Sequence, residues 1–227
     1  MFANALRAAA GRAAPAAASA AAAARRRLSV MPMAFENVVQ LPLLQSEDRD
    51  AVRQIWDGHH AEQDDALGLS VEGSALKILH ARATACPYFV LPVFRDEGHM
   101  MLVTQWSAPH FLLAYLEDYK TSQSSAPAWM AVSAYDNMLE DKDLGLLRGQ
   151  VSLDHLTKQE ADACMALLLQ FYIMPDRYRE VLTFNQRPAE FDHAAHLDLC
   201  KRVLAGEIAG DGAGAGASES PPPEEAK

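Results

Sequence analysis

The sequence predicts an α+β domain in which helices cover a mostly antiparallel sheet, and three observations support this fold class. The chain has 227 residues, of which 50% are hydrophobic and 22% are charged, a balance typical of a chain that folds around a core. Strand-like alternation and turn signals fall in the middle of the chain, within residues 86–153. Helical spacing of apolar residues falls on both sides of that region, which favours a sheet covered by helices.

Composition divides the chain into a single domain, residues 31–205, and two low-complexity ends that we expect to be disordered. Alanine fills 15 of the first 24 positions, and residues 1–30 carry five arginines and no acidic residue. This composition is typical of an organellar transit peptide, and we expect a mitochondrial presequence cleaved between residues 26 and 33. A chloroplast leader or a plain Ala-rich extension is the alternative. Residues 206–227 form an acidic, Pro/Gly-rich tail with no bulky apolar residue after Ile208.

Net charge and cysteine count exclude several classes of protein. The formal net charge is −10, and removing the five N-terminal arginines takes it to −15. Neither value suits binding to nucleic acid, whose phosphates need clustered lysine and arginine. No apolar run approaches the roughly 18 residues that a membrane-spanning helix needs. Three cysteines are too few for a disulfide framework.

Two helices are expected before the sheet. Residues 46–63 carry apolar residues at helical spacing, with Ser46 as the cap and acidic residues in the first turn. Residues 70–83 carry a second such pattern, which Gly73 weakens. The apolar residues that set these patterns are Ala51, Val52, Ile55 and Trp56 in the first helix, and Val71, Ala75, Ile78 and Leu79 in the second.

A β-hairpin is expected next. Residues 86–95 are aromatic and β-branched, residues 96–98 are a turn signal, and residues 100–106 form the returning strand. Pro92 has no N–H to donate, so the first strand lies at a sheet edge or carries a bulge. Residues 110–120 are expected to form a short helix with Phe111, Ala114 and Tyr115 packing inward. Further strands are expected at residues 129–135 and 144–153, where Gly149 marks a bulge or a close approach.

Three helices are expected after the sheet. Thr157 and Glu160 match a capping box, in which each side chain satisfies a free amide of the other residue. The helix that they open ends at Pro175, and short helices follow at residues 177–185 and 191–204, the last capped by Asp192.

The sequence contains no set of residues that indicates catalysis or cofactor binding. It lacks the Walker-type phosphate loop and the G-x-S-x-G elbow of hydrolases. His59 and His60, followed by Asp64 and Asp65, could bind a metal, but adjacent histidines on a helix point about 100° apart, which favours a solvated polar face. Cys86 could act as a nucleophile with His80 or His99, although a free cysteine is more often a small buried hydrophobe. We therefore expect no enzyme activity, no cofactor and no metal.

Several stretches taken together resemble one protein family. The most specific stretch reads Thr-Phe-Asn-x-Arg-Pro-x-Glu-Phe over residues 183–191. Weaker matches are Pro87-x-Phe89-Val90-Leu91-Pro92, Gln105-Trp106, Leu146-Leu147-Arg148-Gly149, Leu156-Thr157-x-x-Glu160-Ala161 and Phe171-Tyr172. In order and spacing, residues 70–200 resemble the mitochondrial F1-ATPase assembly factor 1 family, the chaperone of the F1 β subunit.

The resemblance implies a binding protein that acts in the mitochondrial matrix. Members of the family hold the newly imported β subunit until the α subunit arrives. We therefore expect a monomer that binds the unassembled F1 β subunit of ATP synthase, shields its apolar α-facing surface and releases it without hydrolysing ATP. In the chloroplast stroma, the partner would be the plastid β subunit. The alternatives are a stable structural subunit of a mitochondrial complex and a small thiol hydrolase that uses Cys86.

The predicted hairpin and the segment after it are the expected contact surface, because an apolar edge strand can cover or extend a partner. The expected contact residues are Phe89, Leu91, Met101, Trp106, Phe111 and Tyr115. A second group matches the family motifs and is expected to be structural. Its members are Pro87, Pro92, Gln105, Gly149, Glu160, Phe171, Tyr172, Phe184, Asn185, Arg187, Pro188 and Phe191.

Overall fold

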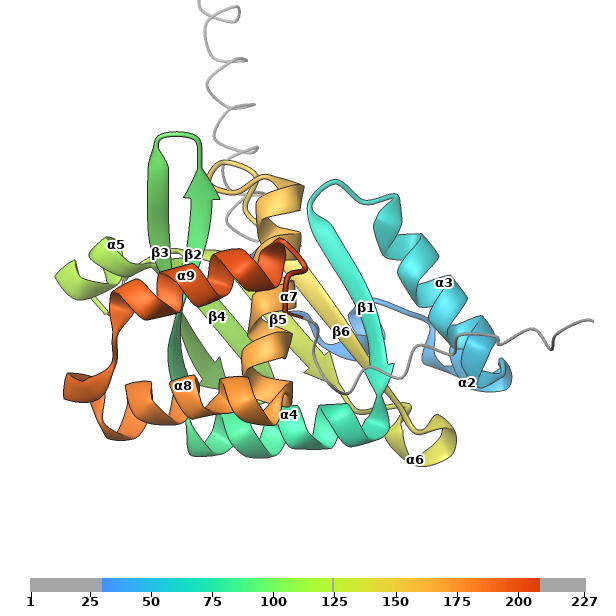
Figure 1. The fold of residues 1–227 in the computed structure, drawn as a ribbon. Coiled ribbons are helices and arrows are strands. Elements are labelled where there is room, and N and C mark those ends of the chain that lie inside the picture. The colour runs from blue at the N-terminus through green and yellow to red at the C-terminus, as the bar shows by residue number, and fades with distance from the viewer. Residues whose placement is uncertain (1–29, 124, 209–227) are drawn as a thin grey trace, which may run out of the picture.

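The computed structural model describes residues 30–123 and 125–208, and its centre is one six-stranded sheet (Figure 1). The strand order is β1-β6-β5-β4-β3-β2, and every neighbouring pair is antiparallel. The strands are β1 Ala66–Glu72, β2 Tyr88–Arg95, β3 Gly98–Ser107, β4 His110–Tyr115, β5 Ala128–Tyr135 and β6 Leu144–Val151. The expected leader, residues 1–30, and tail, residues 206–227, lie almost entirely outside the described residues.

Helices cover both faces of this sheet, as the sequence predicts for an α+β domain. They are η1 Phe35–Asn37, α2 Leu41–Ser46, α3 Arg49–Ala61, α4 Gly73–Ala85, α5 Leu116–Thr121, α6 Leu139–Lys142, α7 Lys158–Ile173, α8 Pro175–Gln186, η2 Pro188–Glu190 and α9 His193–Leu204. No helix in the described ranges has the length and apolarity needed to cross a bilayer.

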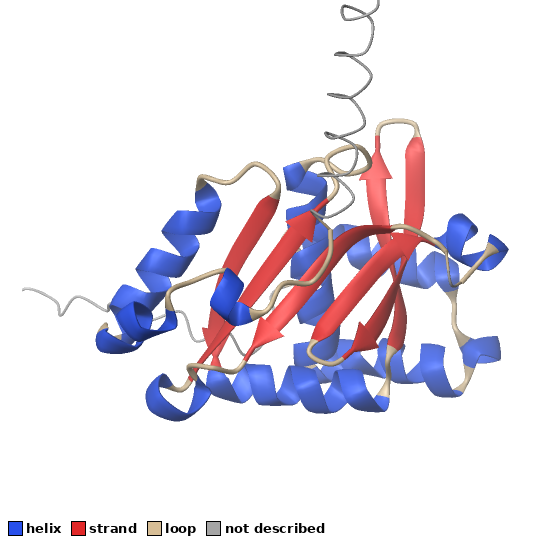
Figure 2. Ribbon diagram, turned by 180° about the vertical axis from the view of Figure 1, so that it is seen from behind, coloured by secondary structure: helices blue, strands red, loops and turns tan. Residues whose placement is uncertain are grey.

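The two faces of the sheet carry different cores because successive strand residues point to opposite sides. Leu147 of β6 belongs to the larger core, which packs against α4, α7, α8 and α9 on what we call the first face. Leu146 points the other way, into a smaller core with Phe35, Leu44 and Trp56. Figure 2 shows this second face, with η1, α2 and α3 lying toward the β1 side of the sheet.

Several elements are as the sequence predicts. Their sequence patterns involve residues that are close together in the chain. β2 and β3 form the hairpin, and Pro92 lies on the edge strand β2, opposite Met101. A Cβ atom on Gly149 would lie 2.7 Å from Cε of Met130, so this glycine marks a close approach. The capping box of α7 is present: the Thr157 hydroxyl accepts from the Glu160 amide, and the Glu160 carboxylate accepts from the Thr157 amide.

Residues 110–120 correct the sequence prediction, because the expected helix is mostly a strand. β4 occupies His110–Tyr115, and only Leu116–Thr121 are helical. β4 lies between β3 and β5, so both sides of its backbone are paired in the sheet. The apolar side chains fit this strand as well as a helix, since Phe111 and Leu113 point into the larger core on the same face.

The N-terminal boundaries also differ from the prediction. Residues 46–63 are divided between two helices: Ser46 ends α2, and Asp48 caps α3 by accepting a hydrogen bond from the Ala51 amide at 2.8 Å. Residues 70–72 belong to β1, and α4 begins at Gly73. A side chain at Gly73 would collide with Asp143 and Leu139, which explains a glycine at this junction.

Candidate partner-binding site

The six contact residues expected from the sequence lie mostly in the core of the domain. Phe89, Leu91, Trp106 and Phe111 are buried on the first face, beneath the helices that cover it, and Trp106 contacts His80 and Thr84 of α4. Met101 and Tyr115 are half-buried, and Tyr115 stacks on Trp129 with ring centroids 5.1 Å apart. The four buried side chains could touch a partner only if the helices left this face.

The motif residues lie around the same core. Phe171, Tyr172 and Phe191 are buried and surround Phe89, while Phe184 is half-buried against it. The Tyr172 hydroxyl donates to the carbonyl of Cys86 at 2.8 Å. Two of the remaining motif residues form ion pairs: Glu160 pairs with Arg95 at 2.6 Å, and Arg187 pairs with Glu190 at 2.8 Å. Two prolines lie at element boundaries, since Pro188 opens η2 and Pro87 precedes β2. Gln105 is half-buried on β3.

Asn185 hydrogen-bonds the exposed backbone edge at the start of β2. Its Nδ2 donates to the Tyr88 carbonyl at 2.6 Å, and its Oδ1 accepts from the Tyr88 amide at 3.3 Å. Further along the edge, the His196 ring hydrogen-bonds the Val90 carbonyl at 3.1 Å, and Pro92 has no N–H at all. Side chains of α8 and α9 therefore occupy backbone groups with which another strand would pair.

We expect Asn185→Ala to lower the free energy of unfolding by about 0.5–1.5 kcal/mol, because it removes the side-chain partner of the Tyr88 backbone. Thr183→Ala is the matched control on the same helix, since the exposed Thr183 hydroxyl bonds only the Arg179 carbonyl one turn back. Urea unfolding of both variants measures the difference. Equal stabilities would show that Asn185 does not hold the edge.

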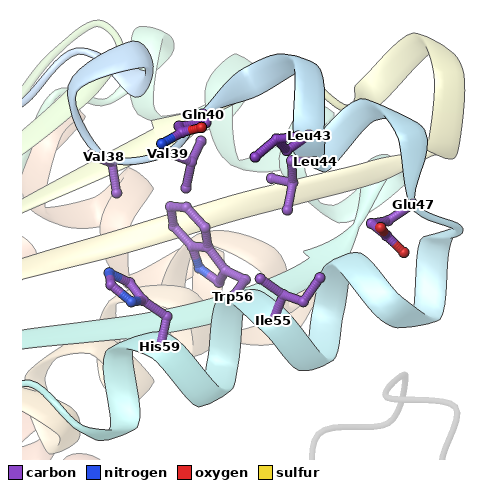
Figure 3. Close-up of a pocket in the computed structure, with 9 residues that line it drawn as sticks. All are labelled: Val38, Val39, Gln40, Leu43, Leu44, Glu47, Ile55, Trp56 and His59. Atoms are coloured by element: carbon purple, nitrogen blue, oxygen red, sulfur yellow. The ribbon is translucent and has the colours of Figure 1, made fainter.

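An apolar groove opens between α2 and α3, on the second face (Figure 3). Residues 38–47 form one wall and Ile55 and His59 of α3 form the other, around a volume of about 270 Å³. Trp56 lies at the base, where its indole Nε1 donates to the Leu147 carbonyl at 3.1 Å. Leu43 is 64% exposed and Ile55 is 47% exposed, so apolar side chains meet solvent here.

The surroundings of the groove are acidic. Residues 36–65 contain eight acidic and two basic residues. The two basic residues, Arg49 and Arg53, both pair with Glu72 of β1, which offsets one of their two positive charges. The groove therefore suits an apolar segment whose flanks are neutral or basic. Residues 38–45 contain five apolar residues but no helix or strand pattern that would predict an element there.

The cysteines are buried inside the domain. All three cysteines are free and buried, and burial raises the pKa of Cys164 and of Cys200 to about 12. A thiol with such a pKa stays protonated at neutral pH, and the thiolate is the nucleophile. No described histidine hydrogen-bonds Cys86, and no group of three described His, Cys, Asp or Glu residues could hold a metal ion.

Comparisons with known proteins identify relatives of the chain. It is 25% identical to the ATP synthase mitochondrial F1 complex assembly factor 1 of Danio rerio over 162 residues, which are 70% of this chain and 53% of that protein. The human protein of the same name is 25% identical over 176 residues, 76% of this chain and 53% of that protein. Protein atp11, mitochondrial, of Schizosaccharomyces pombe is 25% identical over 180 residues, 72% of this chain and 60% of that protein.

The chain spans about half the length of the first two relatives. A family model, described as ATP11 protein, matches residues 4–196, which is most of the chain. Each of the motif residues named above falls within that range. The chain therefore belongs to the ATP11 protein family.

Proposed function

We propose that this protein is an assembly chaperone of the F1 part of mitochondrial ATP synthase. Membership of the ATP11 family carries the proposal, and the names of two relatives describe F1 complex assembly factors of mitochondria. In this proposal the protein acts in the mitochondrial matrix as a monomer. It binds the unassembled β subunit, shields the apolar surface that faces α, and releases the β subunit without hydrolysing ATP.

Such a chaperone must bind the β subunit with moderate strength. An unassembled β subunit exposes the apolar surface that α later covers, and a large exposed apolar patch promotes aggregation. A protein that covers the patch must bind well enough to prevent aggregation. It must also lose to the α subunit by mass action, which needs no nucleotide of its own.

We place the contact at the groove between α2 and α3 rather than at the buried hairpin side chains. The groove offers exposed apolar side chains and a preformed cavity with the Glu47 carboxylate in its lining, whereas Phe89, Leu91, Trp106 and Phe111 are occupied by the domain's own core. Met101 and Tyr115 retain some exposure and stay candidates for a peripheral contact.

Aggregation of purified F1 β subunit, followed by light scattering, tests the function. We expect the full chain to suppress aggregation at close to one molecule per β subunit, and added α subunit to reverse the binding. A stable structural subunit would instead remain in the finished F1 complex. Absence of suppression, together with absence of a complex on a sizing column, would contradict the chaperone proposal.

Leu43→Asp tests the place of contact. The added charge is exposed, so it should leave the melting temperature within about 2 °C, while it weakens β-subunit binding at least about tenfold because a carboxylate enters an apolar contact. Leu153→Asp is the matched control, since Leu153 is 53% exposed in the loop after β6 and away from the groove. Equal affinities of the two variants would show that the β subunit contacts another part of the protein, and the chaperone proposal would stand.

A further inference from the structure

A row of polar side chains crosses the second face of the sheet. His110 of β4 lies opposite Ser133 of β5, Ser133 lies opposite Arg148 of β6, and Arg148 lies opposite Gly68 of β1. The His110 ring hydrogen-bonds the Ser133 hydroxyl at 3.0 Å. Arg148 is the charged member of the row, and only 8% of its surface is exposed.

Arg148 has no partner for its charge among the described residues. It makes no hydrogen bond and no ion pair there, and its Nε is enclosed without an acceptor. By contrast, Arg95 pairs with Glu160, and Arg82 donates to the Tyr172 and Ile173 carbonyls. A buried charge without a counter-charge costs several kcal/mol of folding free energy, so its retention needs a reason.

The groups around Arg148 do not supply the missing charge. His60 is buried nearby, its Nδ1 donates to the Trp56 carbonyl, and burial lowers its pKa to about 4, so it is neutral. Burial also lowers the pKa of His110. The Asp65 carboxylate attracts Arg148 from beyond ion-pair distance and accepts a hydrogen bond from Gln150 at 3.1 Å. Arg148 therefore forms no ion pair with a described residue, and Asp65 attracts it only from a longer distance.

The β4 end of the row is partly exposed. η1, α2 and α3 lie toward the β1 side of the second face, and Figure 2 shows no described helix over the middle of β4. His110 and Leu112 of β4 and Gln105 of β3 are half-buried on this face, so solvent reaches them. Arg148 is 8% exposed and lies in the same row of the second face as the half-buried His110.

We propose that Arg148 anchors the bound β subunit by pairing with a carboxylate on the apolar segment that docks there, an inference that rests on the proposed function. One guanidinium matches one carboxylate in a bidentate pair. A phosphate or nucleotide would need more positive charge than this row offers, and the net charge of −10 disfavours a polyanion. Arg148 is already desolvated and held in place, so pairing loses less free energy to ordering than a mobile surface arginine would.

Binding of purified F1 β subunit to full-chain variants tests this anchor. Arg148→Met should weaken binding about 30-fold or more, as truncation of a buried interfacial arginine does. It should also leave the melting temperature unchanged or raise it, because it removes an unpaired buried charge. Arg148→Lys keeps the charge and should recover part of the affinity. Arg202→Met removes one exposed positive charge on α9 and should bind like the wild type.

The outcomes separate the two proposals. If the wild-type chain binds the β subunit and Arg148→Met binds equally well, the anchor is wrong and the chaperone function stands. If Arg148→Met loses stability and affinity together, while Arg148→Lys recovers neither, the residue is structural and the anchor is again wrong. If the wild-type chain does not bind the β subunit, the proposed function itself fails.

Discussion

Phe89→Ala is expected to lower the free energy of unfolding by about 3–5 kcal/mol, because it removes a fully buried ring and leaves a cavity. This loss is a large part of the 5–15 kcal/mol that stabilises a typical domain. The Phe89 ring is the centre of an aromatic cluster that joins β2 to the C-terminal helices. The rings around it are those of Phe171, Tyr172, Phe184, Phe191 and His196, with centroids 5.0–6.5 Å away.

Tyr88→Ala is the matched control for Phe89→Ala. Tyr88 is the neighbouring residue, but its side chain points to the opposite face and is 39% exposed. We expect this variant to lose less than about 1 kcal/mol, since its backbone bonds to Asn185 remain. Urea unfolding followed by tryptophan fluorescence measures both. If the two variants were equally stable, the Phe89 ring would not be part of the core.

Acid is expected to destabilise the fold between pH 6.5 and pH 4, through His60 and His196. Both side chains are buried, and burial lowers the pKa of each from 6.5 to about 4. The unfolded chain takes up protons on these residues as the pH falls below 6.5, whereas the folded chain does not until about pH 4. Stability is therefore complete above pH 6.5 and falls below it. At pH 5.5 the two residues together cost about 3 kcal/mol.

Urea midpoints at pH 7.5, 6.5 and 5.5 measure this dependence. His196→Gln keeps a donor for the Val90 carbonyl and removes one titrating group, so the slope of stability against pH should fall by about half. His193→Gln is the control on the same helix, because the His193 side chain is exposed. A wild-type midpoint that stays constant from pH 7.5 to pH 5.5 would show that the buried histidines titrate normally.

The groove and the Arg148 row lie on the same face of the sheet, and Trp56 connects them. The Trp56 ring forms the base of the groove, and its centroid is 4.4 Å from that of His60, which packs against Gly68 beside Arg148. A single partner segment that crossed this face would meet apolar side chains first and the buried guanidinium next. Leu43→Asp and Arg148→Met would then weaken the same binding event, and their effects would be non-additive if the two contacts are coupled.

The sequence by itself determined the elements whose hydrogen bonds are local. The hairpin follows from two β-rich runs around a turn, the start of α7 follows from Thr157 and Glu160, and the start of α9 follows from Asp192. Pro92 predicts an edge position or a bulge for β2, and the sheet order shows the edge. In each case the partners lie within a few residues of each other, so the pattern contains the whole interaction.

Tertiary structure decided the rest, because the deciding partners are far apart in the chain. β4 is a strand since β3 and β5 pair with both of its sides, and its apolar spacing fits a helix equally well. The burial of the β2 side chains was also decided by tertiary structure. The helices that pack on the sheet bury Phe89 and Leu91. Arg148 is recognisable in the sequence as one charge within an apolar strand, but only the fold shows that no described residue neutralises it.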